Sequence, residues 1–126
     1  MRFIISIISV ICLSLCLHAC GGNTSVALYF EWGACDFDRD RWALADRVGR
    51  GCMMSSFLDR HPPHGMSVVE LKLWLGEPSL YADFEDPAYL VAQAASSGTA
   101  VREQLLVFKI DRITGRVVEV ALRAPR

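Results

Sequence analysis

The feature that most constrains the fold is the stretch of residues 65–78, which encodes one short helix with both ends specified. Ser67 is a favourable N-cap residue, and Glu70 three positions later completes a capping box. Gly76 suits the turn after the last helical residue, and Pro78 prevents the helix from continuing. Such a short helix is marginal in water unless its apolar face packs on other elements. The residues that define this motif are Ser67, Glu70, Leu71, Trp74, Leu75, Gly76 and Pro78.

A second helix is predicted over residues 50–60, because these residues carry one apolar stripe at helical spacing. The stripe consists of Met53, Met54, Phe57 and Leu58. The apolar face of the first helix consists of Leu71, Trp74 and Leu75. We therefore expect Trp74 to lie in the core, with both helices against a sheet.

The sheet is predicted after Pro78, from three segments with strand-like composition. These are residues 88–92, 101–110 and 116–123, and Gly115 ends the hairpin connection of residues 111–115. Alternation places Leu106, Phe108 and Ile110, and likewise Val118, Val120 and Leu122, on core-facing sides, with Lys109 and Glu119 outside. The sequence thus predicts an α+β fold in which two short helices pack on one face of a three-stranded antiparallel sheet.

The first nineteen residues have the layout of a secretory signal peptide: Arg2, then an uncharged apolar run, residues 3–17. Leu17-His18-Ala19-Cys20 resembles the lipobox of bacterial lipoproteins, in which the cysteine receives lipid and becomes the first mature residue. The resemblance implies a membrane anchor at Cys20, and Gly21 rather than Asp after it favours the outer membrane of a Gram-negative bacterium. The alternative is an ordinary signal peptide cut after Ala19.

Charge and length limit the class of protein. The chain has 13 basic and 14 acidic residues, of which residues 1–19 contain only Arg2, and no long basic run. This balance argues against nucleic acid as a partner. We expect three parts: the signal peptide, residues 20–49 with the lipidated cysteine, a tether and a partly ordered segment, and an α+β domain over residues 50–126.

The mature chain keeps two cysteines besides Cys20, namely Cys35 and Cys52. In an oxidising compartment we expect a disulfide between them, and closing a loop of this length stabilises the fold by roughly 3 kcal/mol on the chain-entropy model. The alternative is two free thiols, because the sequence does not show geometry.

No reactive or metal-binding constellation is predicted. His61 and His64 flank Pro62-Pro63 without zinc-like spacing or an obvious third ligand. Four acids, Glu77, Asp83, Glu85 and Asp86, gather around one loop, which is typical of a solvated surface. We therefore expect a non-enzymatic protein without a cofactor or metal.

The order of elements resembles the SmpA/OmlA (BamE-like) family of small outer-membrane lipoproteins. The resemblance rests on residues 65–67, Glu70-Leu71, residues 74–78, Tyr89 and residues 106–110 followed by 115–118. The pattern of Phe37-Asp38, Trp42, Arg50 and Met53 looks more like the uncharacterised small lipoproteins related to this family than like BamE itself. The resemblance implies a fold of the BamE-like or β-lactamase-inhibitor-protein-like type. It also implies a non-catalytic scaffold or accessory in outer-membrane or envelope protein assembly, with protein partners in the outer membrane or periplasm. The alternative is a periplasmic module that binds or inhibits an enzyme or ligand.

Overall fold

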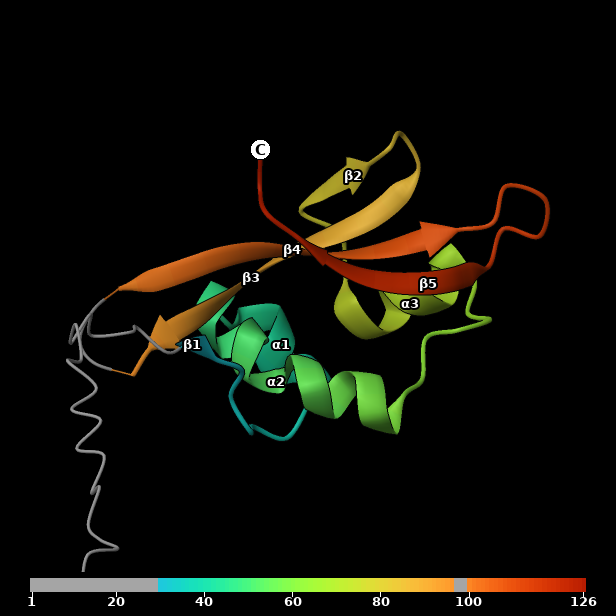
Figure 1. Ribbon diagram of the computed structural model, residues 1–126. Helices are drawn as coiled ribbons and strands as arrows, with labels where there is room; N and C mark the ends of the chain where they lie inside the picture. Colours follow the sequence, from blue (N-terminus) through green and yellow to red (C-terminus); the bar gives the residue numbers. More distant parts are fainter. Residues whose placement is uncertain (1–29, 97–99) are drawn as a thin grey trace, which may run out of the picture.

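The structure, a computed structural model, describes residues 30–96 and 100–126. The predicted signal peptide, Cys20 and the tether lie outside the described residues. One antiparallel sheet forms the upper layer in Figure 1, and all three helices lie beneath it on a single face. The general α+β class predicted from the sequence is therefore confirmed.

The sheet contains more strands than the sequence predicts. Its order is β1-β3-β4-β5. Strands β1 and β2 share one edge of β3: β2 pairs with the start of β3, and β1 pairs with its end. The expected sheet of three strands and layer of two helices were wrong in number, because β1, β2 and α1 are too short to show a periodic pattern. The elements are β1 (Phe30–Glu31), α1 (Arg39–Leu44), α2 (Arg47–Arg60), α3 (Val68–Leu75), β2 (Leu80–Ala82), β3 (Asp86–Ala95), β4 (Val101–Ile110) and β5 (Val117–Arg123).

Helix α3 has the ends that the sequence specifies. The Ser67 hydroxyl accepts a hydrogen bond from the Glu70 backbone N–H at 3.1 Å, and the Glu70 carboxylate accepts one from the Ser67 N–H at 3.0 Å. Gly76 ends the helix with a φ of 73°, a conformation that costs glycine little. Two carbonyl groups at this end accept bonds from distant side chains. The indole N–H of Trp42 donates to the Leu75 oxygen at 3.0 Å, and the Tyr89 hydroxyl donates to the Gly76 oxygen at 2.8 Å.

The tryptophan at the centre of the core is Trp42, which is 1% exposed. Its ring contacts Tyr89 edge-on, and the Arg50 guanidinium lies 5.2 Å from the ring centre. The segment of residues 30–49 therefore belongs to the same core as the rest of the domain. Trp74 is only half-buried and stacks on His61 with ring centres 3.9 Å apart.

A bulge in β5 changes which valine enters the core. Ile110 pairs with Val117 whereas Lys109 pairs with Glu119, so Val118 has no partner across the ladder. Val117 is fully buried and Val118 is 47% exposed. The expectation that Val118 lies on the core-facing side was wrong, because the extra residue reverses the alternation. Lys109 and Glu119 form an ion pair at 3.5 Å.

Helix α2 approaches β3 closely because Gly51 has no side chain. A β-carbon at this position would overlap the carbonyl oxygen of Ala92. The three buried apolar residues of α2 then contact the sheet and α3. They are Met53, Met54 and Phe57.

We predict that Gly51→Ala lowers the free energy of unfolding by about 3 kcal/mol, because the helix must move away from rigid strand backbone. Ser55→Ala, at an exposed position of the same helix, is the matched control and should change stability by under ~0.5 kcal/mol. Chemical denaturation measures both. Equal stabilities of the two variants would contradict the close helix–strand contact.

We also predict that Trp42→Ala costs about 3–5 kcal/mol of unfolding free energy, because it removes a buried ring and leaves the Leu75 carbonyl without its donor. Trp74→Ala should cost clearly less, since part of this ring already contacts water. Urea unfolding of both variants provides the comparison. A larger loss for Trp74→Ala would make Trp74 the core residue, as the sequence alone suggests.

Candidate functional site

The residues singled out in the sequence do not converge on one site. Leu71 and Leu75 are buried, Trp74 and Pro78 are half-buried, and the remaining motif residues form the ends of α3. They act in folding. Cys20, the expected lipid attachment site, lies outside the described residues.

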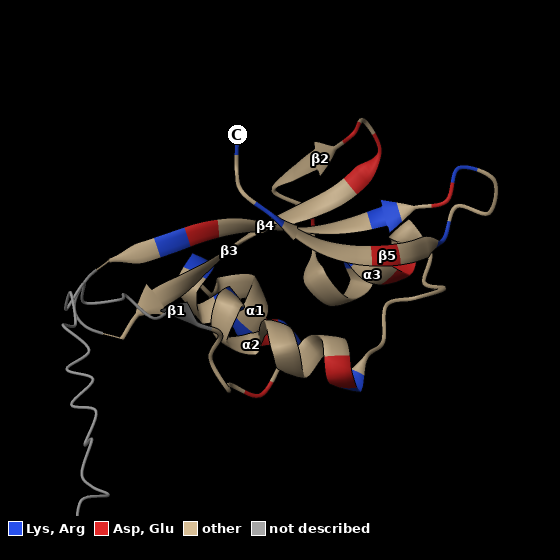
Figure 2. Ribbon diagram, viewed as in Figure 1, with Lys and Arg blue, Asp and Glu red and all other residues tan. Residues whose placement is uncertain are grey.

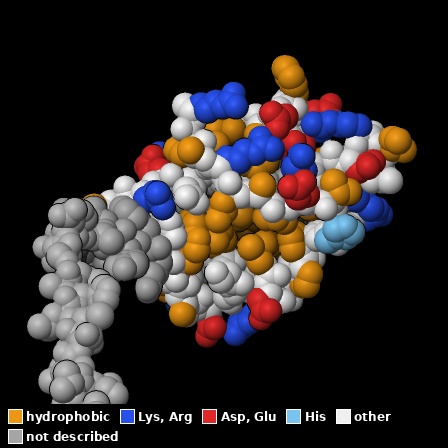
Figure 3. Space-filling view, in the orientation of Figure 1, with side chains coloured by type: hydrophobic (Ala, Val, Ile, Leu, Met, Phe, Trp, Pro, Cys, Tyr) orange, Lys and Arg blue, Asp and Glu red, His pale blue; other side chains and the backbone are white. Residues whose placement is uncertain are grey.

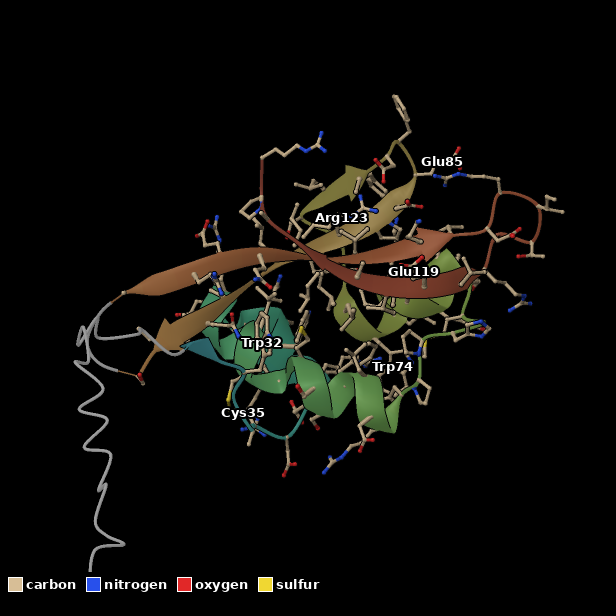
Figure 4. All side chains as sticks on the ribbon, in the orientation of Figure 1. Trp32, Cys35, Trp74, Glu85, Glu119 and Arg123 are labelled. Atoms are coloured by element: carbon tan, nitrogen blue, oxygen red, sulfur yellow. A yellow bond between two sulfur atoms is a disulfide. The ribbon has the colours of Figure 1, made fainter. Side chains whose placement is uncertain are left out.

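A disulfide joins Cys35 to Cys52, with Cα atoms 5.1 Å apart. The Cys35 backbone N–H also donates to the Cys52 carbonyl at 3.1 Å. The bond ties the loop before α1 to the first turn and a half of α2. Figure 4 shows Cys35 on the helix side of the molecule, away from the outer face of the sheet.

His61 has a structural role, whereas His64 is exposed. His61 caps the C-terminal end of α2, where its backbone N–H donates to the Phe57 carbonyl at 2.8 Å, and its ring stacks on Trp74. Across residues 30–96 and 100–126, no group of three or more His, Cys, Asp or Glu side chains is placed to hold a metal ion.

Each acid of the expected acidic loop contacts a cation. Asp83 contacts Arg123 at 2.7 Å, and Arg112 contacts both Glu85 at 3.0 Å and the buried Asp86 at 3.2 Å. Glu77 contacts Lys72 at 3.4 Å. Figure 2 shows these charges of both signs on the two hairpin turns and the neighbouring strands. Each of these four carboxylates therefore has a cation as its partner.

The most unusual surface is the pair of hairpin tips, which we define as residues 83–85 and 111–115. The first joins β2 to β3 and the second joins β4 to β5. Each tip carries a large apolar side chain in water: Phe84 is 97% exposed and Ile113 is 95% exposed. Arg112 links the tips, because its guanidinium contacts Glu85 and donates to the Asp83 carbonyl at 3.2 Å. The two apolar residues are therefore presented from one connected structure.

The backbone of the first tip is held in an unfavourable conformation. Asp83 has a φ of 45° and Phe84 a φ of 76°, values that a non-glycine residue, and above all a bulky one, rarely adopts. The contacts of Arg112 and Arg123 with Asp83 and Glu85 maintain this turn. The second tip is ordered by the Asp111 carboxylate, which accepts the backbone N–H groups of Ile113 and Thr114, each at 2.8 Å.

Both tips depend on an ionised carboxylate. The hydrogen bond from Arg123 lowers the pKa of Asp83, and the backbone N–H groups of Thr114 and Ile113 lower the pKa of Asp111. A depressed pKa in the folded state stabilises the fold above the unfolded-state pKa, and this contribution is lost as pH falls through the folded-state value. Both contributions to the stability of the tips are thus present at neutral pH.

A cavity of about 560 Å³ opens on the outer face of the sheet, beside the first tip. Leu80, Ala82 and Leu105 form its apolar floor, and the chain after β5 closes one side. Arg123, which bonds Asp83, lies at its rim; in Figure 4 its label lies on the side of the sheet away from the helices.

Sequence reasoning missed Phe84, Ile113 and their link through Arg112. The available signal was an aromatic residue within an acidic turn, Asp83-Phe84-Glu85-Asp86, where apolar side chains are not needed for folding. The distance in sequence between the tips hid Arg112, since only the sheet brings residue 112 beside residue 85.

No known protein family, no curated protein and no solved structure matches the chain. In the described part of the chain, none of the helices has the length and apolar character needed to cross a membrane.

Proposed function

We propose that this protein is a non-catalytic protein-binding module, anchored to the outer membrane through lipidated Cys20, that acts as a scaffold or accessory in envelope protein assembly. The observation that carries the binding role is the pair of hairpin tips. Phe84 and Ile113 are nearly fully exposed, and both turns are held in place by hydrogen bonds and ion pairs.

The energetics of the first tip support a binding role. A positive φ at a phenylalanine costs of order 1–3 kcal/mol. Since Phe84 makes almost no contact that buries it, folding gains nothing from this side chain. A preordered aromatic side chain does favour binding, because little rotamer and backbone freedom is lost when a partner covers it.

The position of the tips supports an anchored arrangement. The described chain begins at β1, which pairs with the end of β3, whereas the tips lie beside the start of β3. Figure 1 shows β1 and the tips at opposite ends of the sheet. Ten strand residues separate these ends by about 30 Å. A lipid at Cys20 would therefore leave the tips free to reach periplasmic or membrane partners, and would raise their effective concentration there.

The resemblance to the SmpA/OmlA (BamE-like) family supports the assembly role and a BamE-like arrangement of the helices and the last three strands. A second candidate is an inhibitory module that inserts Phe84 into a concave site of a periplasmic enzyme. The protruding, preordered turn favours this alternative. A Cys20→Ala chain distinguishes the two, because an inhibitor keeps its activity when released and an assembly factor loses its phenotype.

We predict that Phe84→Gly raises the free energy of unfolding by about 1 kcal/mol, since glycine adopts the positive φ freely, while reducing the amount of bound partner. Ile113→Ser should reduce binding with little effect on stability. Affinity isolation from detergent-solubilised envelopes, with partners identified by mass spectrometry, measures binding, and thermal unfolding measures stability.

Leu44→Ser is the matched control, because Leu44 is 90% exposed on α1 and is not part of either tip. It should leave partner recovery unchanged. If both tip variants recover the same partners as the unmodified protein in the same amounts, the tips are not the contact surface and the proposed function loses its main support.

A further inference from the structure

Within residues 30–96 and 100–126, strand β5 forms one edge of the sheet, and most of that edge has no strand beside it. Among the described residues, only Val117 is paired there: its N–H donates to the Met66 carbonyl and its carbonyl accepts the Gly65 N–H, both at 2.8 Å. Residues 118–123 continue past this point with one side of the backbone open. An edge of this kind is a template for another strand.

The direction of the open backbone groups follows from the register. The Ile110 N–H donates to Asp86 of β3, so the backbone groups of Ile110 point away from β5. Because directions alternate along a strand, Lys109, Val107 and Leu105 face β5 and bond with their partners in the register, Glu119, Ala121 and Arg123. The backbone groups of Val120 and Leu122 then point outward, available to a further strand, whereas Val118 lies in the bulge, where the alternation is interrupted.

We propose that this edge binds the β5 edge of a second copy of the same chain, in an antiparallel pairing centred on Ala121. In this register Glu119 lies directly opposite Arg123 of the second copy, and Arg123 opposite its Glu119. Val120 likewise lies opposite Leu122 of the second copy, and the backbone groups of both residues point toward the partner strand. Shifting the centre by one residue in either direction removes both charge pairs, so the sequence of β5 is self-complementary in one register only.

Both ends of the pairing are defined. Val117 is already bonded to residues 65–66, and Pro125, which would lie opposite it, has no N–H to donate. The pairing therefore lies within residues 118–124 of each copy, with its backbone hydrogen bonds between Val120 and Leu122 of the two copies. The twofold axis makes it a closed dimer rather than a growing filament. The existing ion pairs can remain, because a carboxylate accepts several hydrogen bonds.

The helix-facing side of β5 supplies apolar surface for the dimer. Val120 is partly buried against the core, and Leu122 is 42% exposed although it pairs with the buried Leu106. The helix layer contacts the sheet mainly where α2 crosses β3. Figure 3 shows hydrophobic side chains open to water in the centre of this view, which corresponds to the region between β5 and α2 in Figure 1. A second β5 would cover the outer part of this patch.

The first test is cysteine cross-linking of the full-length protein in intact cells. Ala121→Cys would face its own copy across a non-hydrogen-bonded pair, with a Cα separation of about 4.5 Å that suits a disulfide. Val118→Cys is the matched control, because it is exposed on the same strand but would lie about 20 Å from its copy. We expect a disulfide-linked dimer with Ala121→Cys and none with Val118→Cys. Equal cross-linking of the two variants, or cross-linking of the Ala121→Cys variant to a different protein, overturns the proposal.

The second test uses charge reversal and does not depend on a new cysteine. Glu119→Arg places like charges at both contacts, as does Arg123→Glu, and each should weaken the dimer roughly tenfold. An equimolar mixture of the two variants restores both opposite-charge pairs in the mixed dimer, as does the double variant in its own dimer. Native mass spectrometry of the detergent-solubilised protein should detect mixed dimers in excess. If the mixture dimerises no better than either variant, self-pairing of β5 is excluded, whatever protein the hairpin tips bind.

Discussion

The structure depends on how the backbone carbonyl groups at the C-terminal end of α3 are hydrogen-bonded. The last carbonyl groups of a helix have no partner within it, and leaving them buried without donors is costly. Here Trp42 donates to Leu75 and Tyr89 donates to Gly76. One donor comes from α1 and the other from the central strand, so a single helix end joins the N-terminal segment, the helix layer and the sheet. The central aromatic cluster is a consequence, because Trp42 and Tyr89 must lie together to reach adjacent carbonyl groups.

The outer face of the sheet differs from the helix-facing side in the kind of side chains that cover it. The face toward the helices is covered by large apolar side chains, whereas the opposite face has a small apolar cluster bounded by ion pairs. Asp86 takes part in both the sheet and the charged surface. Its buried carboxylate accepts the Ile110 N–H and also contacts Arg112. The charges thus order the turns and leave the exposed apolar residues of the tips without a folding role.

The elements that could be predicted are those specified by residues close together in the sequence. Capping residues and helical spacing predicted α3 and most of α2. Strand-like composition predicted part of β3, and composition with alternation predicted β4 and β5. The role of the N-terminal segment could not be predicted, because it depends on the bond of Trp42 to the distant Leu75 rather than on the short elements α1 and β1. The position of Val118 depends on a bulge that the pattern does not encode. The candidate site was missed for the same reason, since Arg112 and Glu85 meet only once the sheet has formed.

The disulfide has a consequence for the stability of the C-terminal end of α3. Cys35 and Cys52 enclose the loop that contains Trp42, and the bond spans 17 residues. Closing such a loop removes conformational freedom of the unfolded chain worth roughly 3 kcal/mol, and all of it acts on the segment that supplies the donor to Leu75. Reduction would therefore weaken the end of α3 from a distance, without touching α3 itself. The oxidised chain would therefore hold the core around Trp42 more firmly than the reduced chain.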